Sequence, residues 1–436
     1  MKRTLTGAIL LATGAWSLMA ASPEPSAKLP YWKDIQTVQV NKEKPRTAFT
    51  SFDSRQQALK ARMEDSPYRK SLNGEWDFYY VDGYKDLPAG IEQPDSKADW
   101  KKIKVPGNWE VQGYGTAIYT NHGYEFKPRN PRPPELPEAN PVGVYRRTFE
   151  VPADWDGRDV YLSIDGAKSG VYVYVNGKEV GYNEDSKNTA EFKLNKYIHP
   201  GENTLVLKIF RWSTGSYLEC QDFWRMSGIE RDVFLFSQPD THISDFHVVS
   251  TLDDTYRNGE FRLDVDVEDA SNSTVAYELV APDGATVASG EGKAQAGKDV
   301  KFSATVKDVA TWTSEAPNLY RLLITLKNGA GEVTEVVPYN VGFRRFEIKE
   351  NGEKSEKGMP YVCFFVNGQP IKLKGVNIHE HNPETGHYMT EELMRKDFEL
   401  MKQNNINTVR LCHYPQTNKF YDLCDEYGLY VYDEAN

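Results

Sequence analysis

The sequence predicts a multidomain, mainly β fold that ends in the first strands and helices of an incomplete parallel α/β barrel. A chain of 436 residues is too long for a single core. Hydrophobic and polar residues alternate over much of its length, which is typical of half-buried strands. The last segment instead reads strand, helix, strand, helix, strand. We therefore divide the chain into residues 1–22, 23–69, 70–240, 241–347 and 348–436.

Residues 1–22 have the pattern of a cleavable signal peptide. Lys2 and Arg3 precede an apolar stretch, and Ala20-Ala21-Ser22 offers a cleavage site made of small residues. The apolar stretch is too short and too interrupted to span a membrane. We therefore expect a periplasmic or secreted product without a membrane span. Its mature chain begins with a polar arm over residues 23–69.

Charge and cysteine content narrow the function classes. The 52 basic and 63 acidic residues give a net charge of −11, and no basic block offsets it, so we expect no nucleic-acid partner. The four cysteines have no paired spacing, which favours buried free thiols over a disulfide framework or a metal site. Aromatic residues make up 12% of the chain. Aromatic side chains can stack on the apolar faces of sugar rings, although the cores of β-rich domains are also rich in aromatic residues.

Residues 70–240 form the first predicted β domain. Every second residue is Val, Leu or Ile over residues 160–164 and again over 171–175, just before an Asn176-Gly177 turn. A later loop, residues 217–229, is dense in acid, amide and aromatic groups. Such a loop either binds sugar hydroxyls or is a surface loop held by its own ion pairs.

Residues 241–347 form a second all-β unit. Phe261, Leu263, Val265 and Val267 alternate with charged residues, so one face of this strand is buried. Short alternating strands over about 100 residues are typical of an immunoglobulin-like sandwich. The unit carries no chemistry that we recognise, and we interpret it as a spacer.

Residues 348–436 change to an α/β pattern. A strand is expected through Ile371, Leu373 and Val376, followed by a helix for which Thr390 is the N-cap. A second strand begins at Asn407, and a second helix ends at Gly428 before a third strand. This order is that of a parallel barrel, whose chemistry lies at the carboxyl ends of the strands.

Two histidines follow the first and second of these strands. Because the carboxyl ends of barrel strands converge, we expect His379 and His413 to be neighbours. Imidazoles can bind sugar hydroxyls, although a loop-packing role explains either residue equally well. His379-Glu380-His381 does not suit a zinc site, because adjacent residues of an extended segment point to opposite faces.

Several motifs together resemble glycoside hydrolase family 2, and within it the large bacterial β-galactosidases. The resemblance covers nearly all of the mature chain and implies a jelly-roll sugar-binding domain, an immunoglobulin-like domain and a (β/α)₈ TIM barrel. The motifs are Leu72-Asn73-Gly74-Glu75-Trp76, Tyr119-Thr120-Asn121, residues 217–229, Gly375-Val376-Asn377-Ile378-His379-Glu380-His381, and residues 407–436 with their final Asp433-Glu434-Ala435-Asn436.

The resemblance implies roles for five residues. Asn121 and Asp222 resemble first-domain residues that contact the galactosyl group, and Asp222 is also implied as a sodium ligand. His379 and His413 resemble the histidines that bind sugar hydroxyls. Arg410 resembles an arginine that supports the carboxylates of the site.

The same resemblance implies that no catalytic residue lies in this chain. Family members use two glutamates about 5 Å apart, as general acid/base and nucleophile, on later strands. We expect these glutamates, and the glutamate and histidine that bind magnesium, to follow Asn436. The chain is then a truncated product or a partial sequence. It is expected to be inactive and, with an unclosed barrel, poorly folded past roughly residue 350.

The resemblance implies a retaining exo-β-galactosidase whose substrate is a β-galactoside. The full-length enzyme is expected to need magnesium and sodium, and it can form a homo-oligomer. One alternative is a non-catalytic carbohydrate-binding protein built from the two sandwiches. Another is a fragment of a β-glucuronidase or β-mannosidase, which share the architecture. The loop around Asp222 and the Tyr119-Thr120-Asn121 segment favour the β-galactosidase.

Overall fold

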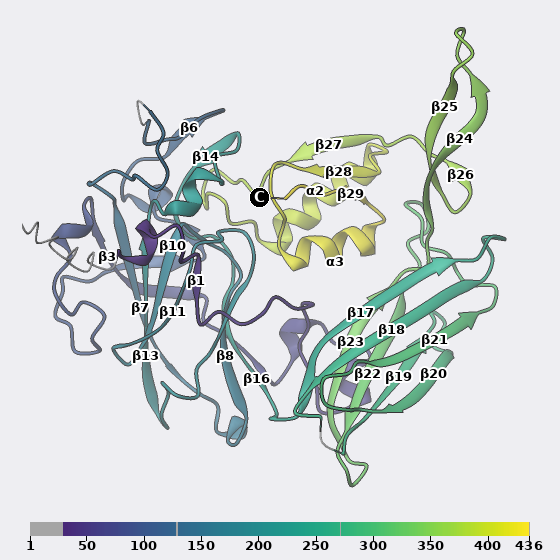
Figure 1. Cartoon of the computed structure of the whole chain (residues 1–436), viewed down its shortest axis with the longest axis horizontal. Coiled ribbons are helices and arrows are strands. Elements are labelled where there is room, and N and C mark those ends of the chain that lie inside the picture. Colours follow the sequence, from purple (N-terminus) through teal and green to yellow (C-terminus); the bar gives the residue numbers. More distant parts are fainter. Residues whose placement is uncertain (1–28, 128–129, 271, 436) are drawn as a thin grey trace, which may run out of the picture.

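The computed structural model describes residues 29–127, 130–270 and 272–435, so the predicted signal peptide over residues 1–22 lies outside the described residues. The described chain is mainly β, as predicted. Two β-sandwiches lie on either side of a small α/β segment, with the N-terminal arm running between the sandwiches (Figure 1). No helix among these residues has the length and apolar character that a membrane crossing requires.

The first sandwich packs a large sheet against a smaller one around a core of aromatic and β-branched side chains, including Trp76, Phe78 and Leu207. Alternate residues of each strand face this core, which is why the sequence alternates. In spatial order the large sheet is β1 (Gln39–Val40), β11 (Lys178–Asn183), β10 (Gly170–Val175), β13 (Glu202–Phe210), β7 (Val142–Glu150), β3 (Gly74–Val81) and β4 (Lys101–Val105). The smaller sheet is β12 (Ala190–Lys193), β8 (Asp159–Ile164), β16 (Val233–Gln238) and β2 (Arg69–Ser71).

Two small sheets shape the edge of this sandwich that faces the α/β segment. Strand β14 (Phe223–Arg225) pairs with β6 (Ile118–Thr120), which sets Trp224 opposite Tyr119. Strand β15 (Gly228–Ile229) lies between β5 (Gly107–Asn108) and β9 (Ala167–Lys168). The predicted sugar-binding loop, residues 217–229, is therefore a pair of short strands held against the sandwich.

The arm ties the two sandwiches together. Arg46 makes a two-pronged ion pair with Glu191 of β12, with both N–O distances at 2.9 Å. The next residue, Thr47, donates its backbone N–H to Asp245 of the second sandwich at 2.9 Å. Helix α1 (Arg55–Ala58) follows, capped by the side chain of Ser54.

The second sandwich has the two-sheet architecture expected of an immunoglobulin-like unit. Its core contains Phe261, Leu263 and Val265 of one sheet against Leu322 and Ile324 of the other. One sheet is β17 (His242–Leu252), β18 (Gly259–Glu268) and β21 (Val300–Val306); the other is β20 (Thr286–Lys293), β19 (Thr274–Val280), β22 (Tyr320–Lys327) and β23 (Val333–Val341). Beyond it, β24 (Phe346–Lys354), β25 (Pro360–Val366) and β26 (Gln369–Pro370) form a separate projecting sheet (Figure 1).

The α/β segment is a three-stranded parallel sheet with two helices packed on it. Its elements are β27 (Gly375–Ile378), α2 (Glu391–Gln403), β28 (Thr408–Leu411), α3 (Asn418–Tyr427) and β29 (Tyr430–Tyr432). The helices bury Met394, Phe398, Phe420 and Leu423 against Val409 of the central strand. The predicted alternation of strands and helices is confirmed.

The first strand of this segment begins later than predicted. Leu373 lies outside β27 and is 46% exposed. The side chain of Asn407 accepts the backbone N–H of Lys374 at 2.8 Å and donates to the carbonyl of Lys372 at 3.0 Å. The side chain of Asn407 thus takes two backbone groups just before β27, while its own backbone N–H donates to the Lys374 carbonyl at 2.9 Å.

Candidate functional site

A pocket of about 440 Å³ lies where the carboxyl end of β27 meets the edge of the first sandwich. The first sandwich contributes Tyr119, Asp222 and Trp224 to its lining, and the α/β segment contributes His379 and His381, among other residues. The pocket is therefore built from segments more than 150 residues apart in the sequence, and it exists only because the two units pack together.

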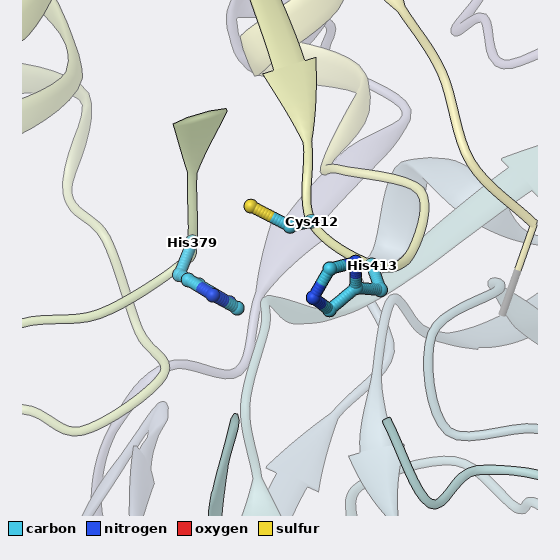
Figure 2. Close-up of side chains that lie close together, drawn as sticks. All are labelled: His379, Cys412 and His413. Atoms are coloured by element: carbon cyan, nitrogen blue, oxygen red, sulfur yellow. The ribbon is translucent and has the colours of Figure 1, made fainter. Parts of the chain in front are cut away.

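His379 and His413 lie side by side. Ile378 and Leu411 are register partners in the parallel pair β27 and β28, so the residues after them leave the sheet at the same edge. The imidazole rings stand edge to face with centroids 5.6 Å apart (Figure 2). Burial, together with the charge of His413, lowers the pKa of His379, which favours its neutral form at neutral pH.

His413 is held by a carboxylate. Its Nδ1 lies 3.0 Å from Oε2 of Glu434, and Arg410 Nε donates to Oε1 of the same glutamate at 2.7 Å. The hydrogen bond from His413, with that from Arg410, lowers the pKa of Glu434. Arg410 thus holds Glu434, which in turn orients the His413 ring, and none of these three residues is in the described lining of the pocket.

Asp222 stands at the rim of the pocket beside exposed aromatic rings. Its carboxylate accepts a hydrogen bond from the Tyr119 hydroxyl at 2.8 Å. Tyr119 and Trp224 are 55% and 42% exposed, with ring centroids 5.6 Å apart. An acceptor next to open aromatic faces can bind a hydroxyl and the apolar face of the same sugar ring.

The structure does not bring Asn121 into the lining of this pocket. Asn121 follows the last residue of β6 and is exposed. Its side-chain oxygen lies 2.7 Å from Nδ1 of the neighbouring His122. The role that the family resemblance implies for Asn121 therefore has no geometric counterpart among the described residues.

Sequence reasoning missed a buried cluster of charged residues behind the pocket. Arg231 donates two hydrogen bonds to Glu380, at 2.9 and 2.8 Å. Lys187 Nζ lies 2.6 Å from Glu230 and 3.2 Å from Glu380, and His387 Nδ1 is 2.8 Å from Glu230. The only local sign of this buried cluster in the sequence is the charged pair Glu230-Arg231 directly after the apolar Ile229.

The electrostatics of this cluster follow from its burial. Burial alone would raise the pKa of Glu380, but the charges of Arg231 and Lys187 outweigh it and lower that pKa. The pKa of Glu230 is likewise held well below its ordinary value, against burial, by Lys187 and His387. Burial lowers the pKa of His387, and Glu230 only partly opposes this.

The pocket lining contains two carboxylates, Asp222 and Glu380, that can be compared with the needs of a hard cation. Sodium and magnesium sites are built from several oxygen ligands. Asp222 offers an exposed carboxylate, whereas Glu380, also in the lining, is already paired with Arg231 and Lys187. In the described lining, Asp222 is therefore the one carboxylate outside an ion pair, and it accepts the Tyr119 hydroxyl. The four cysteines are free thiols, with Cys412 and Cys424 buried and Cys220 and Cys363 half-buried.

Three sequence models of a single family match successive parts of the chain. The glycosyl hydrolases family 2 sugar-binding domain matches residues 69–239, a further glycosyl hydrolases family 2 model matches residues 241–344, and the family 2 TIM barrel domain matches residues 361–436. Together they cover both sandwiches and the α/β segment, and the chain belongs to glycoside hydrolase family 2.

Curated relatives carry the name β-galactosidase. The protein of Priestia megaterium is 39% identical over 94% of this chain and 40% of its own length. That of Vibrio cholerae is 38% identical over 93% of this chain and 39% of its own length. The chain thus spans about two fifths of the length of the relatives that it matches.

Solved structures share the fold at lower identity. The β-glucuronidase of Bifidobacterium dentium, in complex with coumarin-3-O-glucuronide, superposes with a TM-score of 0.71 at 22% identity, covering 84% of this chain and 61% of that one. A β-glucuronidase of Bacteroides uniformis gives 0.69 at 23% identity, over 84% and 42%. At this identity the likeness establishes the arrangement of domains alone.

Proposed function

We propose that this chain is the N-terminal part of a retaining exo-β-galactosidase that releases terminal, non-reducing β-D-galactose from β-galactosides. The named relatives support this assignment because their identity to the chain extends over both sandwiches and the α/β segment. In the proposal, the two catalytic glutamates and the magnesium ligands follow Asn436, and the protein is exported to the periplasm or secreted.

The charge of the pocket is the observation that carries the choice of a neutral sugar. Asp222 brings a carboxylate to the rim, the pKa of His379 is lowered, and no lysine or arginine lines the pocket among the described residues. A glucuronate carboxylate would meet the like charge of Asp222 there, and no cationic side chain of the described lining would pair with it. Galactose presents hydroxyls only, which suit acceptors and neutral imidazoles.

Residues in and beside the pocket then have roles in binding, with His413 and Asn121 outside its described lining. Asp222 accepts from a galactose hydroxyl and contributes one ligand to a sodium ion, while Trp224 covers an apolar face of the sugar. His379 binds a second hydroxyl. His413, oriented by Glu434 and Arg410, binds a third. Asn121 reaches the sugar after a rearrangement of the loop beyond β6.

The second candidate is a carbohydrate-binding protein without turnover. It is favoured by the rim of the pocket, where the exposed rings of Tyr119 and Trp224 stand beside the Asp222 carboxylate and suffice to bind a sugar without turnover. The two candidates share the pocket and differ in catalysis.

Binding and turnover assays separate these functions. We expect the 436-residue chain to bind methyl β-galactoside without hydrolysing nitrophenyl β-galactoside, and Asp222→Ala to weaken that binding about tenfold, the loss of one good hydrogen bond to a charged group. Asp308→Ala, at an exposed ion pair on the second sandwich, is the matched control. The gene product that includes any sequence following Asn436 is expected to hydrolyse the galactoside. Preference for the glucuronide would contradict the proposal, and binding without turnover by that product would favour the second candidate.

A further inference from the structure

The projecting sheet formed by β24, β25 and β26 is held on one face by the second sandwich. Tyr256, which lies between β17 and β18, donates its hydroxyl to Glu347 at 2.8 Å and accepts from Nζ of Lys349 at 3.0 Å. Glu347 and Lys349 lie two positions apart on β24 and therefore point to the same face. Lys349 Nζ also lies 4.6 Å from the centroid of the Phe365 ring on β25.

The opposite face of this sheet is apolar and open. Ile348 is the register partner of Phe364, and Glu350 is that of Val362, so these side chains and Phe346 share one side. Phe346, Ile348 and Val362 are 45%, 75% and 61% exposed. We call Phe346, Ile348, Val362 and Phe364 the apolar face. Single exposed apolar residues are ordinary, but several neighbours on one sheet face mark a contact surface.

The base of the apolar face already packs against the parallel sheet. The rings of Phe346 and Phe364 are stacked with centroids 5.6 Å apart, and the Phe346 ring contacts that of Tyr430 at 6.0 Å. Tyr430 is the first residue of β29 and the register partner of Thr408, the first residue of β28. The contact therefore lies at the amino end of the parallel strands, opposite the end that carries the pocket (Figure 1).

The parallel sheet is open on the side that meets the apolar face. Val409 and Val431 pack with the helices α2 and α3 on one side of the sheet, so Tyr430 and Tyr432 point to the other side. Tyr432 is 59% exposed, and in the described part of the chain β29 pairs only with β28. In a barrel the helices lie outside, so this open side is the inner one. Tyr430 joins it to the apolar face.

The size of the apolar face favours an occupant within the same molecule. At about 200 Å² for a fully exposed large apolar side chain, its members leave at most about 400 Å² exposed, whereas a stable interface buries about 800 Å² on each partner. A segment of the same chain loses no translational freedom on docking, so a smaller surface suffices. The β-galactosidases named above are matched over only 40% and 39% of their own length, so most of each lies outside the matched region.

We propose that the apolar face is the floor of an α/β barrel, covered at the amino ends of its strands by the segment that follows Asn436. This inference rests on the proposed function, in which the chain continues beyond that residue. The floor and the sugar pocket then lie at opposite ends of the barrel. Because the other face of the projecting sheet is held by Tyr256, the floor seats the barrel on the second sandwich and does not touch the substrate.

Hydroxyl-radical footprinting of the gene product that includes the sequence following Asn436 tests the floor. Val362 is compared with Val333 and Val287, which are 45% and 37% exposed on the second sandwich. An uncovered Val362, at 61% exposed, would react at least as fast as these two valines. With the floor covered, we expect it to react at least about tenfold more slowly, because a buried side chain is shielded from water. Labelling at the rate of Val333 would overturn the proposal.

The identity of the occupant is tested on the same product. Protection of Val362 should be unchanged when the protein is diluted 100-fold. Protection that is lost on dilution would identify a second copy as the occupant and overturn the proposal, as would a gene that ends at Asn436. Galactoside turnover by the same sample separates this inference from the proposed function. Turnover with Val362 freely labelled would overturn the floor alone, whereas a protected Val362 without turnover would support the floor and contradict the galactosidase.

A charged substitution gives a second measurement. In the longer product, Ile348→Lys should lower the midpoint of thermal unfolding by at least about 4 °C, the shift expected for loss of a buried contact in a domain of barrel size. Val333→Lys, at an exposed position of the second sandwich, is the matched control and should leave the midpoint unchanged. Equal midpoints for the two variants would show that Ile348 stays in water and would overturn the proposal.

Discussion

Gly386 stands where the α/β segment meets the first sandwich, and any side chain at this position would collide with Asn108. Its φ is +74°, and a Cβ would lie closer to Oδ1 of Asn108 than two non-bonded atoms can approach. That oxygen accepts the backbone N–H of His387 at 2.7 Å. We expect Gly386→Ala to lower the free energy of unfolding by about 3 kcal/mol, from about 1 kcal/mol for the left-handed backbone and about 2 kcal/mol for overpacking.

Gly358 is the matched control for this residue. Its φ is +75°, and no atom lies within 4 Å of the position of its Cβ. Gly358→Ala should therefore lower the free energy of unfolding by about 1 kcal/mol, the backbone effect alone. Urea denaturation of the two variants measures both losses of unfolding free energy. Equal losses would show that Asn108 yields to the new methyl group.

At the scale of elements, the two helices of the α/β segment begin differently. The Thr390 side chain accepts the backbone N–H of Leu393 at the start of α2. Thr417, the N-cap residue of α3, makes no such bond, and its hydroxyl is buried without a partner among the described residues. Thr390→Ala should cost about 1 kcal/mol, which corresponds to about fivefold faster amide hydrogen exchange in the first turn of α2.

Thr417→Ala supplies the comparison. Because it removes a buried hydroxyl that has no hydrogen-bond partner, it should leave exchange in α3 unchanged or slower. Mass spectrometry of peptides from the two helices reads both effects in one experiment. Faster exchange in α3 after Thr417→Ala would mean that this threonine caps its helix in solution.

Local patterns were sufficient to predict the elements. The alternation of Phe261, Leu263 and Val265 marks a strand with one buried face, and Thr390 marks a helix start. These signals lie within a few residues of each other and depend on periods of 2 and 3.6. The prediction fails at Leu373, where the side chain of Asn407, 34 positions along the chain, bonds the backbone of both neighbouring lysines.

The site could be predicted only in part for the same reason. That His379 and His413 would be neighbours follows from the parallel order of two strands. By contrast, the Lys187–Glu380 ion pair joins residues 193 positions apart. The sequence around each residue contains no pattern that indicates the other as its partner. Contacts between domains depend on how finished units pack, which single-sequence patterns do not encode.

At the scale of the whole molecule, the buried charge cluster joins the first sandwich to the α/β segment. Lys187, Glu230 and Arg231 come from the sandwich, and Glu380 and His387 from the segment that carries the pocket histidines. Lys187 and Arg231 bring two positive charges, which balance the two negative charges of Glu230 and Glu380. Glu380 directly follows His379, so the pairing that holds the two units together also fixes one wall of the pocket.

Glu380→Gln should therefore loosen the whole assembly, because it leaves Arg231 and Lys187 in a buried site with one carboxylate between them. Removal of one partner from a buried pair costs about 3–5 kcal/mol, whereas Glu291→Gln, at an exposed pair with Lys327, should change the stability little.

Since the pKa of Glu380 is lowered on folding, the contribution of Glu380 to stability is complete above the unfolded pKa of about 4.3 and is lost as pH falls through the folded value. Urea unfolding should thus show a large gap between wild type and Glu380→Gln at pH 7 that narrows at about pH 3.5. A gap that is small at pH 7, or that widens in acid, would mean that the cluster does not hold the two units together.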